Sequence, residues 1–408
     1  MNESYNFDEL VDRANTDCVK LERMKELFGR DDLIPLWVAD MDFRSPPAII
    51  RALQERVSHG VFGYTVPSEG YTRSIINWLS RHHRWEVNPD HINFIPGVVK
   101  GIAFAIDAFT EKGDRVIIQP PVYHPFRIVT QSMGRELVTN PLILERGRYR
   151  MDFDGLREIA SSRRCQMLIL CNPHNPGGTV WSPDELRELA TICVENGILV
   201  VSDEIHGDMV LPGHRHTPFA TVSAEAEANS LTFMAPSKTF NIAGIVSSFA
   251  VIPGDEVRER FLAYLQPREL QQGTLFAFTA TRVAYEECDD WLRQMLDYVQ
   301  GNVRFVDGYL REHVPAIEAM IPEASFLVWL DCRLLALSQP ELVRFFVDKA
   351  GLALNDGTIF GKEGEGFMRV NVGTSRIVLE KALDQLKDAL SVLPVNRDTN
   401  EQIDPLTV

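Results

Sequence analysis

Cysteine pairs that could bind a metal ion or build a disulfide framework are missing from this sequence. Six cysteines are scattered over 408 residues, and no two of them form a Cys-x-x-Cys pair. In a chain of this size, such spacing argues against both a zinc site and a disulfide scaffold. We therefore predict reduced and mostly buried thiols at Cys18, Cys165, Cys171, Cys193, Cys288 and Cys332.

Long apolar runs and a secretion signal are also missing. A membrane helix needs roughly 18 or more consecutive apolar residues, and no stretch approaches that length. The first residues, M-N-E-S-Y-N-F-D-E-L-V-D-R, contain no basic region followed by an apolar core. We expect a protein of the cytoplasm that has no membrane partner.

Positive charge is scarce. The formal net charge is -16, and no run rich in lysine or arginine interrupts it, which disfavours nucleic acids and anionic membrane surfaces as partners. His214 and His216, near Asp208, have the side-chain types of a metal site, but their loop, L-P-G-H-R-H-T-P, is flanked by proline and glycine. We predict no metal there.

The remaining composition is that of an ordinary globular protein, with 45% hydrophobic and 24% charged residues. Single cores stop growing at about 250 to 300 residues, so the length predicts two domains of unequal size. We place a large domain at residues 50–285 and a small one at 286–395. Residues 1–49 should pack with the small domain, and residues 396–408 lack periodicity and should fray.

Apolar strands alternate with helical patterns in the predicted large domain. Strands that are apolar along their whole length are buried on both faces, which is typical of a mainly parallel sheet covered by helices in an α/β fold. The pattern predicts strands at 92–95, 114–118, 166–171, 198–202, 231–235 and 246–252, and helices at 46–59, 71–83, 98–109, 123–132 and 183–196.

The carboxyl-terminal part has longer helical patterns and fewer strands. It predicts a smaller α+β domain with helices at 291–313, 339–350 and 377–390 and strands at 325–330 and 367–372. A further short helix is predicted at 18–28 in the amino-terminal segment.

One lysine, Lys238, lies in a turn at 236–244 between two predicted buried strands. Burial disfavours the charged form of an amine and lowers its pKa, which prepares a lysine to form a Schiff base with an aldehyde cofactor. The alternative is a surface lysine in a hairpin loop.

Polar side chains follow three consecutive strands of the predicted sheet. Asn175 lies in C-N-P-H-N-P-G-G after one strand, Asp203 and His206 lie in S-D-E-I-H at the end of the next, and Lys238 follows the third. Ligands of open parallel sheets bind at the carboxyl ends of strands, so these four side chains predict an active site. Asp203 as a helix cap and His206 as a core histidine are the alternatives.

Gly97 follows another strand and precedes a helix. The first backbone amides of that helix, at Val98 and Val99, could receive a phosphate group.

These motifs resemble the fold type I family of pyridoxal phosphate enzymes, the aspartate aminotransferase superfamily. The resemblance covers nearly the whole chain. The stretches W-V-A-D-M-D-F, H-G-V-F-G-Y, S-K-T-F-N-I-A-G and F-M-R-V-N-V-G are most similar to the cystathionine β-lyase type of carbon–sulfur lyases known as the MalY/PatB group.

The resemblance implies a role for each residue around a pyridoxal 5'-phosphate cofactor. Lys238 would form the Schiff base and move the Cα proton, and Asp203 would pair with the ring nitrogen. Asn175 and His206 would bind the ring oxygen, and Tyr123 would stack on the ring and take part in catalysis. The phosphate would be bound by Gly97, Val98, Val99, Ser237 and Tyr64.

Tyr64 would reach the phosphate and active site of a neighbouring subunit, which implies a homodimer with shared sites. Two positions depart from the family pattern: Ala235 stands where many members have serine, and Val246 where many have arginine. How the phosphate charge is balanced is therefore left open.

For the substrate, the resemblance implies that Arg369 holds the α-carboxylate, with Ala39 and Asn175 beside it. A surface arginine at a strand edge is the alternative for Arg369. The predicted reaction is elimination of a thiol from a small sulfur-containing amino acid, giving pyruvate and ammonia. An aminotransferase is the first alternative, and a regulatory protein that keeps the fold is the second.

Overall fold

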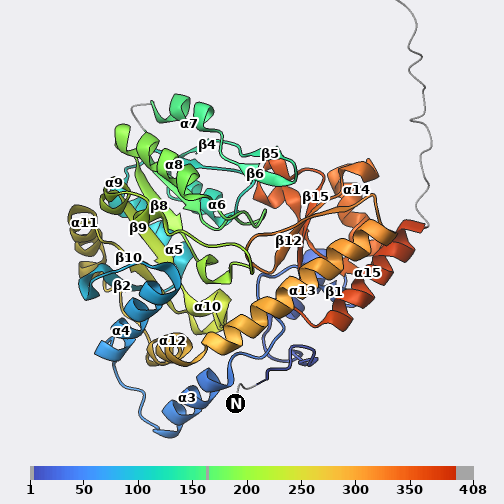
Figure 1. Ribbon diagram of the computed structural model, residues 1–408, viewed down its shortest axis with the longest axis horizontal. Coiled ribbons are helices and arrows are strands. Elements are labelled where there is room, and N and C mark those ends of the chain that lie inside the picture. The colour runs from blue at the N-terminus through green and yellow to red at the C-terminus, as the bar shows by residue number, and fades with distance from the viewer. Residues whose placement is uncertain (1–3, 162–164, 392–408) are drawn as a thin grey trace, which may run out of the picture.

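The computed structural model describes residues 4–161 and 165–391. Its larger sheet has seven strands, and Figure 1 shows helices on both of its faces. Every neighbouring pair of strands is parallel except the two pairs that involve β10. In spatial order the strands are β2 (Ile92–Ile95), β10 (Ser248–Val251), β9 (Ser230–Met234), β8 (Leu199–Asp203), β7 (Cys165–Cys171), β3 (Arg115–Ile118) and β4 (Glu136–Thr139). The predicted α/β fold with a mainly parallel sheet is confirmed.

The central strands are apolar along their length because both of their faces are covered. Alternate side chains of a strand point to opposite faces. Met167 and Ile169 of β7 pack with α5 (Val98–Phe109), α6 (Pro125–Ser132) and α11 (Asp255–Leu265). Their neighbours Leu168 and Leu170 pack with α7 (Phe153–Ala160) and α8 (Pro183–Glu195).

A second sheet has four antiparallel strands in the order β11 (Glu318–Met320), β12 (Leu327–Asp331), β15 (Phe367–Asn371) and β14 (Asn355–Asp356). It lies beside α13 (Asp289–His313), α14 (Gln339–Arg344) and α15 (Arg376–Ser391), on the right in Figure 1. One apolar cluster runs from α4 (Glu69–Trp78) and α12 (Leu275–Glu287) through α13 into β12 and β15. The two sheets are therefore joined by continuous apolar packing.

The amino-terminal segment contains α1 (Val19–Glu22), α2 (Met24–Phe28) and β1 (Ile34–Pro35). β1 pairs in parallel with β13 (Leu352–Ala353), so these residues contact the carboxyl-terminal part of the chain. The domain boundaries at 50 and 285 stay predictions, and residues 396–408 lie outside the described part.

Several elements differ from the prediction. The helix expected at 18–28 is two short helices, because Arg23 between them leaves helical geometry (φ -95°, ψ 1°). The turn expected at 236–244 begins as a short helix, α10 (Pro236–Thr239), with proline at its first position. The sequence pattern does not predict α12, since buried side chains lie on most sides of this helix and form no single apolar stripe. It also does not predict β4, α7, α11, α9 (Ala224–Ala228) or the hairpin β5 (Ile143–Glu145) and β6 (Arg148–Arg150).

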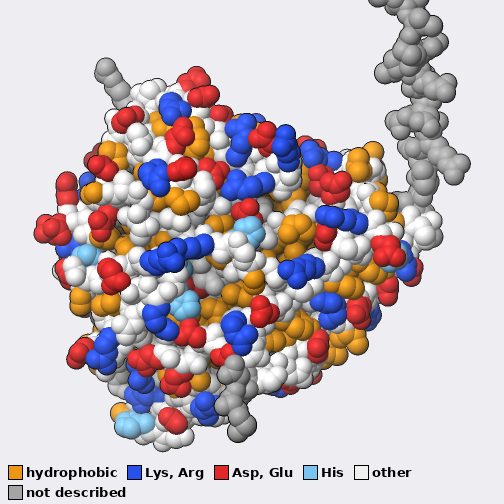
Figure 2. Space-filling view, in the orientation of Figure 1, with side chains coloured by type: hydrophobic (Ala, Val, Ile, Leu, Met, Phe, Trp, Pro, Cys, Tyr) orange, Lys and Arg blue, Asp and Glu red, His pale blue; other side chains and the backbone are white. Residues whose placement is uncertain are grey.

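The surface and the cysteines agree with the composition. On the face in Figure 2, basic side chains are interspersed with acidic ones. All six cysteines are buried and free, as the sequence predicts. Within residues 4–161 and 165–391, no helix is both long enough and apolar enough to cross a membrane.

Gly101 in α5 allows this helix to approach the sheet closely. A Cβ at this position would lie 2.7 Å from the Phe233 ring on β9 and 2.9 Å from the Ile95 side chain. Forcing extra volume into a packed core costs about 1–3 kcal/mol. Gly101→Ala should therefore lower the midpoint of thermal unfolding, measured by circular dichroism.

Gly308→Ala in α13 is the matched control, because nothing lies within 4 Å of the Cβ position there. This change should raise the midpoint slightly, by the roughly 0.5–1 kcal/mol that alanine gains over glycine in a helix. If Gly101→Ala raised the midpoint as Gly308→Ala should, α5 would not be tightly packed on β9.

Candidate active site

The carboxyl ends of several strands of the large sheet lie along one edge. In the parallel strands β7, β8 and β9, Cys171 is opposite Asp203 and Asp203 is opposite Phe233. β2 runs in the same direction as β9, because β10 between them is antiparallel to both. The segments that follow these four strands carry Asn175, His206, Lys238 and Gly97, so the structure brings the predicted residues to one edge.

Lys238 lies on α10, directly after β9. Its Nζ donates a hydrogen bond to the Ala39 carbonyl oxygen at 2.5 Å. Burial lowers the pKa of Lys238 to about 8, and the nearby charges of Asp40 and Arg369 act on it in opposite directions. An amine with this pKa can gain and lose a proton near neutral pH.

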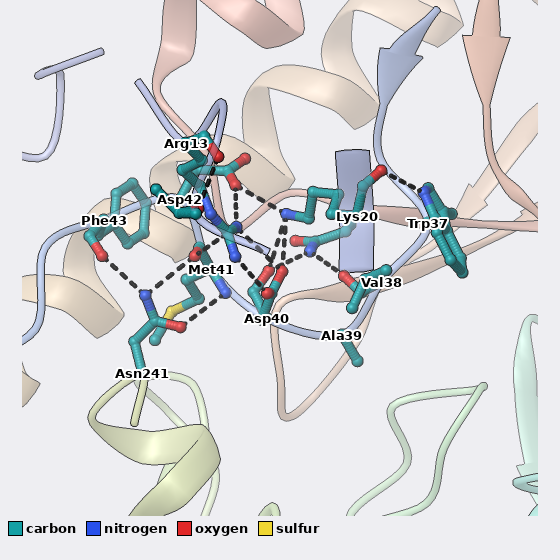
Figure 3. Close-up of polar contacts among 12 residues, drawn as sticks. Arg13, Lys20, Trp37, Val38, Ala39, Asp40, Met41, Asp42, Phe43 and Asn241 are labelled. Atoms are coloured by element: carbon teal, nitrogen blue, oxygen red, sulfur yellow. Dashed lines mark hydrogen bonds and ion pairs between the residues drawn. The ribbon is translucent and has the colours of Figure 1, made fainter. Parts of the chain in front are cut away.

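Ala39 belongs to a segment without helix or strand that we call the strap, residues 36–45 (Figure 3). The side chain of Asn241, from the loop after α10, bonds the strap backbone at Met41 and Phe43 over 2.7–3.0 Å. Asn371 of β15 donates to the carbonyl groups on either side of Ala39, at 2.6 Å each. The strap is therefore fixed on one side by the loop after α10 and on the other by β15.

Asp203 and His206 are both buried at the end of β8. Burial raises the pKa of Asp203 to about 7, and one of its oxygens accepts a bond from the Ile205 amide at 3.1 Å. Burial and the positive charges of Lys238 and Arg369 lower the pKa of His206 to about 3, so its ring is neutral at neutral pH. The Nδ1 atom of His206 has no hydrogen-bond partner among the described residues.

Arg369 of β15 is a buried cation. Its Nη1 donates to Asn175 Oδ1 at 3.0 Å, and its Nη2 donates to Asn355 Oδ1 at 2.5 Å and to the Trp37 carbonyl at 3.1 Å. All of these acceptors are neutral, and its Nε has no partner among the described residues. Burial lowers the pKa of Arg369 to about 10. A buried guanidinium without a counter-ion favours an anionic ligand.

The start of α5 forms another anion-binding feature. Gly97 caps this helix with φ +113°, a conformation that favours glycine. Its own N–H donates to Ser248 Oγ at 2.8 Å. The amides of Val98 and Val99 that follow have no acceptor within the helix, as in the first turn of any helix, so they can bind a phosphate.

The two positions that depart from the family pattern cannot help to bind an anion. Ala235 is buried directly before α10. Val246 has φ +56°, an uncommon value for a β-branched residue, and is 43% exposed. Neither side chain carries a hydrogen-bond donor. A phosphate at this end would depend on backbone amides and on the buried Ser237.

Tyr123 and Tyr64 lie in different environments. Burial raises the pKa of Tyr123, and the charge of Asp203 raises it further, so Tyr123 lies near the carboxylate at the end of β8. Tyr64 is fully exposed on the loop between α3 (Pro47–Ser58) and α4. The structure does not bring Tyr64 to the site of its own chain.

The histidines of the 211–218 loop make no metal cluster. His216 Nε2 bonds Glu204 at 2.7 Å. In the described part of the chain, no group of three or more His, Cys, Asp or Glu side chains could hold a metal ion.

Sequence reasoning misses five residues that support the site. Arg13, Lys20 and Asp42 form an ion cluster with Asp40 of the strap, and Asn371 fixes the strap backbone. The stretch W-V-A-D-M-D-F could have pointed to the two aspartates, since alternating acids in an apolar segment need buried counter-charges.

The fold and the residues at the sheet edge define the class of this protein: an α/β enzyme of fold type I, with a lysine on the helix after a central strand. Comparison with known proteins agrees. The family model of aminotransferase class I and II matches residues 31–386, and the chain belongs to this family.

The chain is similar to individual members over nearly its whole length. It is 44% identical to cystathionine beta-lyase PatB of Bacillus subtilis and 31% identical to the protein MalY of Escherichia coli. Each alignment covers 95% of this chain and 99% or more of the relative. The crystal structure of cystalysin from Treponema denticola, which contains a pyridoxal 5'-phosphate cofactor, superposes with a TM-score of 0.92 at 34% identity, covering 96% of this chain and 100% of that one.

The raised pKa of Asp203 predicts a pH-dependent stability. An unfolded aspartate has a pKa of about 4, whereas the folded value is about 7. Between these values the unfolded chain releases the proton and the folded chain keeps it, so stability falls as pH rises through this window. The difference of about 3 units corresponds to at most about 4 kcal/mol.

Asp203→Asn removes this titration. In protein stripped of bound small molecules, the variant should be more stable towards urea than the wild type near pH 8, and the gap should shrink towards pH 4. A gap that stayed constant over this range would mean that the folded protein does not hold a proton on Asp203.

Proposed function

We propose that this protein is a pyridoxal phosphate-dependent carbon–sulfur β-lyase of the cystathionine β-lyase type. It cleaves the bond between Cβ and sulfur in cysteine S-conjugates and, with consumption of one water molecule, releases a thiol, pyruvate and ammonia. The observation that carries the proposal is the arrangement of Lys238 between a buried carboxylate, Asp203, and a buried cation, Arg369, which has no counter-ion among the described residues. The name of PatB and the cofactor of cystalysin support the choice of reaction and cofactor.

The residues at the sheet edge fit this cofactor. A protonated ring nitrogen would supply the counter-charge that Asp203 lacks. The free Nδ1 of His206 and the amide nitrogen of Asn175, whose oxygen is taken by Arg369, suit the ring oxygen. Tyr123 would stack on the ring. The aldehyde would bond to Lys238, and the phosphate would be held at Gly97, Val98, Val99 and Ser237.

The chain's own residues then position the substrate and move its proton. Arg369 holds the α-carboxylate through two parallel hydrogen bonds, beside Asn175 and the strap at Ala39. Lys238 removes the Cα proton, which a pKa near neutrality allows. When bound, pyridoxal phosphate supplies a sink for the electron pair left at Cα.

Elimination follows because a thiolate is a good leaving group from Cβ. Once the Cα proton is on Lys238, loss of the thiolate is faster than the return of that proton to a different carbon, which transamination requires. Arg369 comes from the predicted small domain and Lys238 from the predicted large one, so the substrate would bind between them.

We also propose a homodimer with shared sites. Tyr64 is fully exposed on the loop between α3 and α4. This loop lies at the periphery of the molecule (Figure 1). A tyrosine presented in this way can reach the phosphate end of a second subunit, where the chain itself offers no side-chain cation at Ala235 or Val246.

The reaction is tested by a product assay. With cystathionine and no keto acid present, purified protein should release pyruvate and free thiol in equal amounts over many turnovers. Lys238→Ala, which lacks the base, should release neither.

An aminotransferase would instead stop after one turnover per site and resume when a keto acid is added. This behaviour would contradict the lyase proposal while leaving the family and the role of Lys238 intact.

The shared site is tested by mixing two inactive variants. Tyr64→Ala and Lys238→Ala chains should form hybrid dimers with one intact site, and activity should return to about a quarter of the wild-type value at equal mixing, since half of the dimers are hybrids with one working site each. Subunit exchange verified by mass spectrometry without recovery of activity would argue against a shared site.

A further inference from the structure

Lys20 of α1 is a buried lysine outside the proposed catalytic set. Its side chain is only 1% exposed. Its Nζ bonds Asp40 Oδ1 at 3.0 Å, Asp42 Oδ1 at 2.8 Å and the Asp40 carbonyl oxygen at 3.1 Å. Burying an ammonium group is costly unless charged and polar partners surround it, and these three acceptors provide that surrounding.

The two aspartates are shared with Arg13 (Figure 3). Arg13 bonds Asp40 at 2.6 Å and Asp42 at 2.8 Å, so the cluster of Arg13, Lys20, Asp40 and Asp42 has two positive and two negative groups. Burial opposes ionisation of Asp40, but its bonds to Arg13 and Lys20 outweigh this effect and hold its pKa below the usual value. The formal charges of the cluster therefore cancel.

This cluster adjoins the carbonyl group that holds the catalytic amine. The Ala39 carbonyl, which accepts from Lys238 Nζ at 2.5 Å, belongs to the peptide group that joins Ala39 to Asp40. The next carbonyl, that of Asp40, is held by Lys20 and by Asn371. With the side chain and the carbonyl of Asp40 both fixed by Lys20, the preceding carbonyl has little freedom to rotate.

We propose, on the basis of the function proposed above, that Lys20 is a positioning residue for Lys238: it fixes the Ala39–Asp40 peptide that holds the amine and neutralises the carboxylate beside it. No contact joins Lys20 to Lys238 directly. Lys20 acts through Asp40, and the effect combines geometry with charge.

The charges that face Lys238 come from three parts of the chain. Asp40 and Lys20 lie in the amino-terminal segment, Asp203 on β8, and Arg369 on β15. The fifth facing group, His206, is neutral at neutral pH. Burial lowers the pKa of Lys238. The charges of Arg369 and Lys20 lower this pKa further, whereas the charges of Asp40 and Asp203 raise it. Removing the charge of Lys20 or of Asp40 should therefore shift the titration of this nitrogen in opposite directions.

The visible absorbance of the bound cofactor provides the measurement, because it changes when the nitrogen contributed by Lys238 gains a proton. In the holoenzyme, Lys20→Met should move the midpoint of this titration to higher pH by about half a unit or more, since Arg13 alone is then left to balance the two carboxylates of Asp40 and Asp42. Asp40→Asn should move it to lower pH. The rising limb of the kcat profile against pH should shift in the same directions.

Two controls separate this role from a general one. Lys20→Arg keeps the charge and should leave the midpoint in place. Lys25→Met removes the same charge from the neighbouring helix α2, where the side chain is 77% exposed, and should also leave it in place.

The proposal is overturned if Lys20→Met and Asp40→Asn shift the midpoint in the same direction or not at all, or if Lys25→Met shifts it equally. Should Lys20→Met fail to fold, Lys20→Gln, which also removes the charge, takes its place with the same expected shift. A holoenzyme with no visible cofactor band would instead contradict the proposed function, so the two failures are distinguishable.

Discussion

The active site depends on burying charged groups that are not fully paired. Asp203, Lys238 and Arg369 lie at the edge of two sheets, where water is largely excluded, and the pKa of each is shifted towards its neutral form. A folded protein tolerates this arrangement only if rigid surroundings oppose local collapse. The closely packed α5, the strap and the continuous apolar cluster between the sheets provide that rigidity.

Much of this arrangement follows from local sequence. Apolar strands that end in polar residues predict the parallel sheet and place Asn175, Asp203 and Lys238 at one edge, because parallel neighbours end on the same side. Gly97 signals the start of α5, since its positive φ requires glycine. The family resemblance adds the roles, which no spacing could supply.

Apart from the two aspartates, the supporting residues could not be predicted, because their partners are far away in the chain. Lys20 is one lysine in a short amphipathic stretch, and only the fold shows that Asp40 and Asp42 surround it. The acceptor of the Lys238 amine is a backbone carbonyl, which has no sequence signature at all. Tyr64 is a different case, because its side chain is fully exposed to solvent in one chain and its proposed role requires a second chain.

Under the proposed function, the strap would also affect what kind of molecule the site accepts. Its carbonyl groups at Trp37 and Ala39, two residues apart, bond Arg369 and Lys238 respectively. A ligand carboxylate that bonds Arg369 would compensate the guanidinium for any bond to the Trp37 carbonyl that it displaces. A simple amine has no carboxylate to bind the guanidinium, so Arg369 would keep its hydrogen bond to the Trp37 carbonyl. Under the proposed function, this short segment of backbone would favour amino acids over simple amines, before any contact with the sulfur-bearing part of the molecule is made.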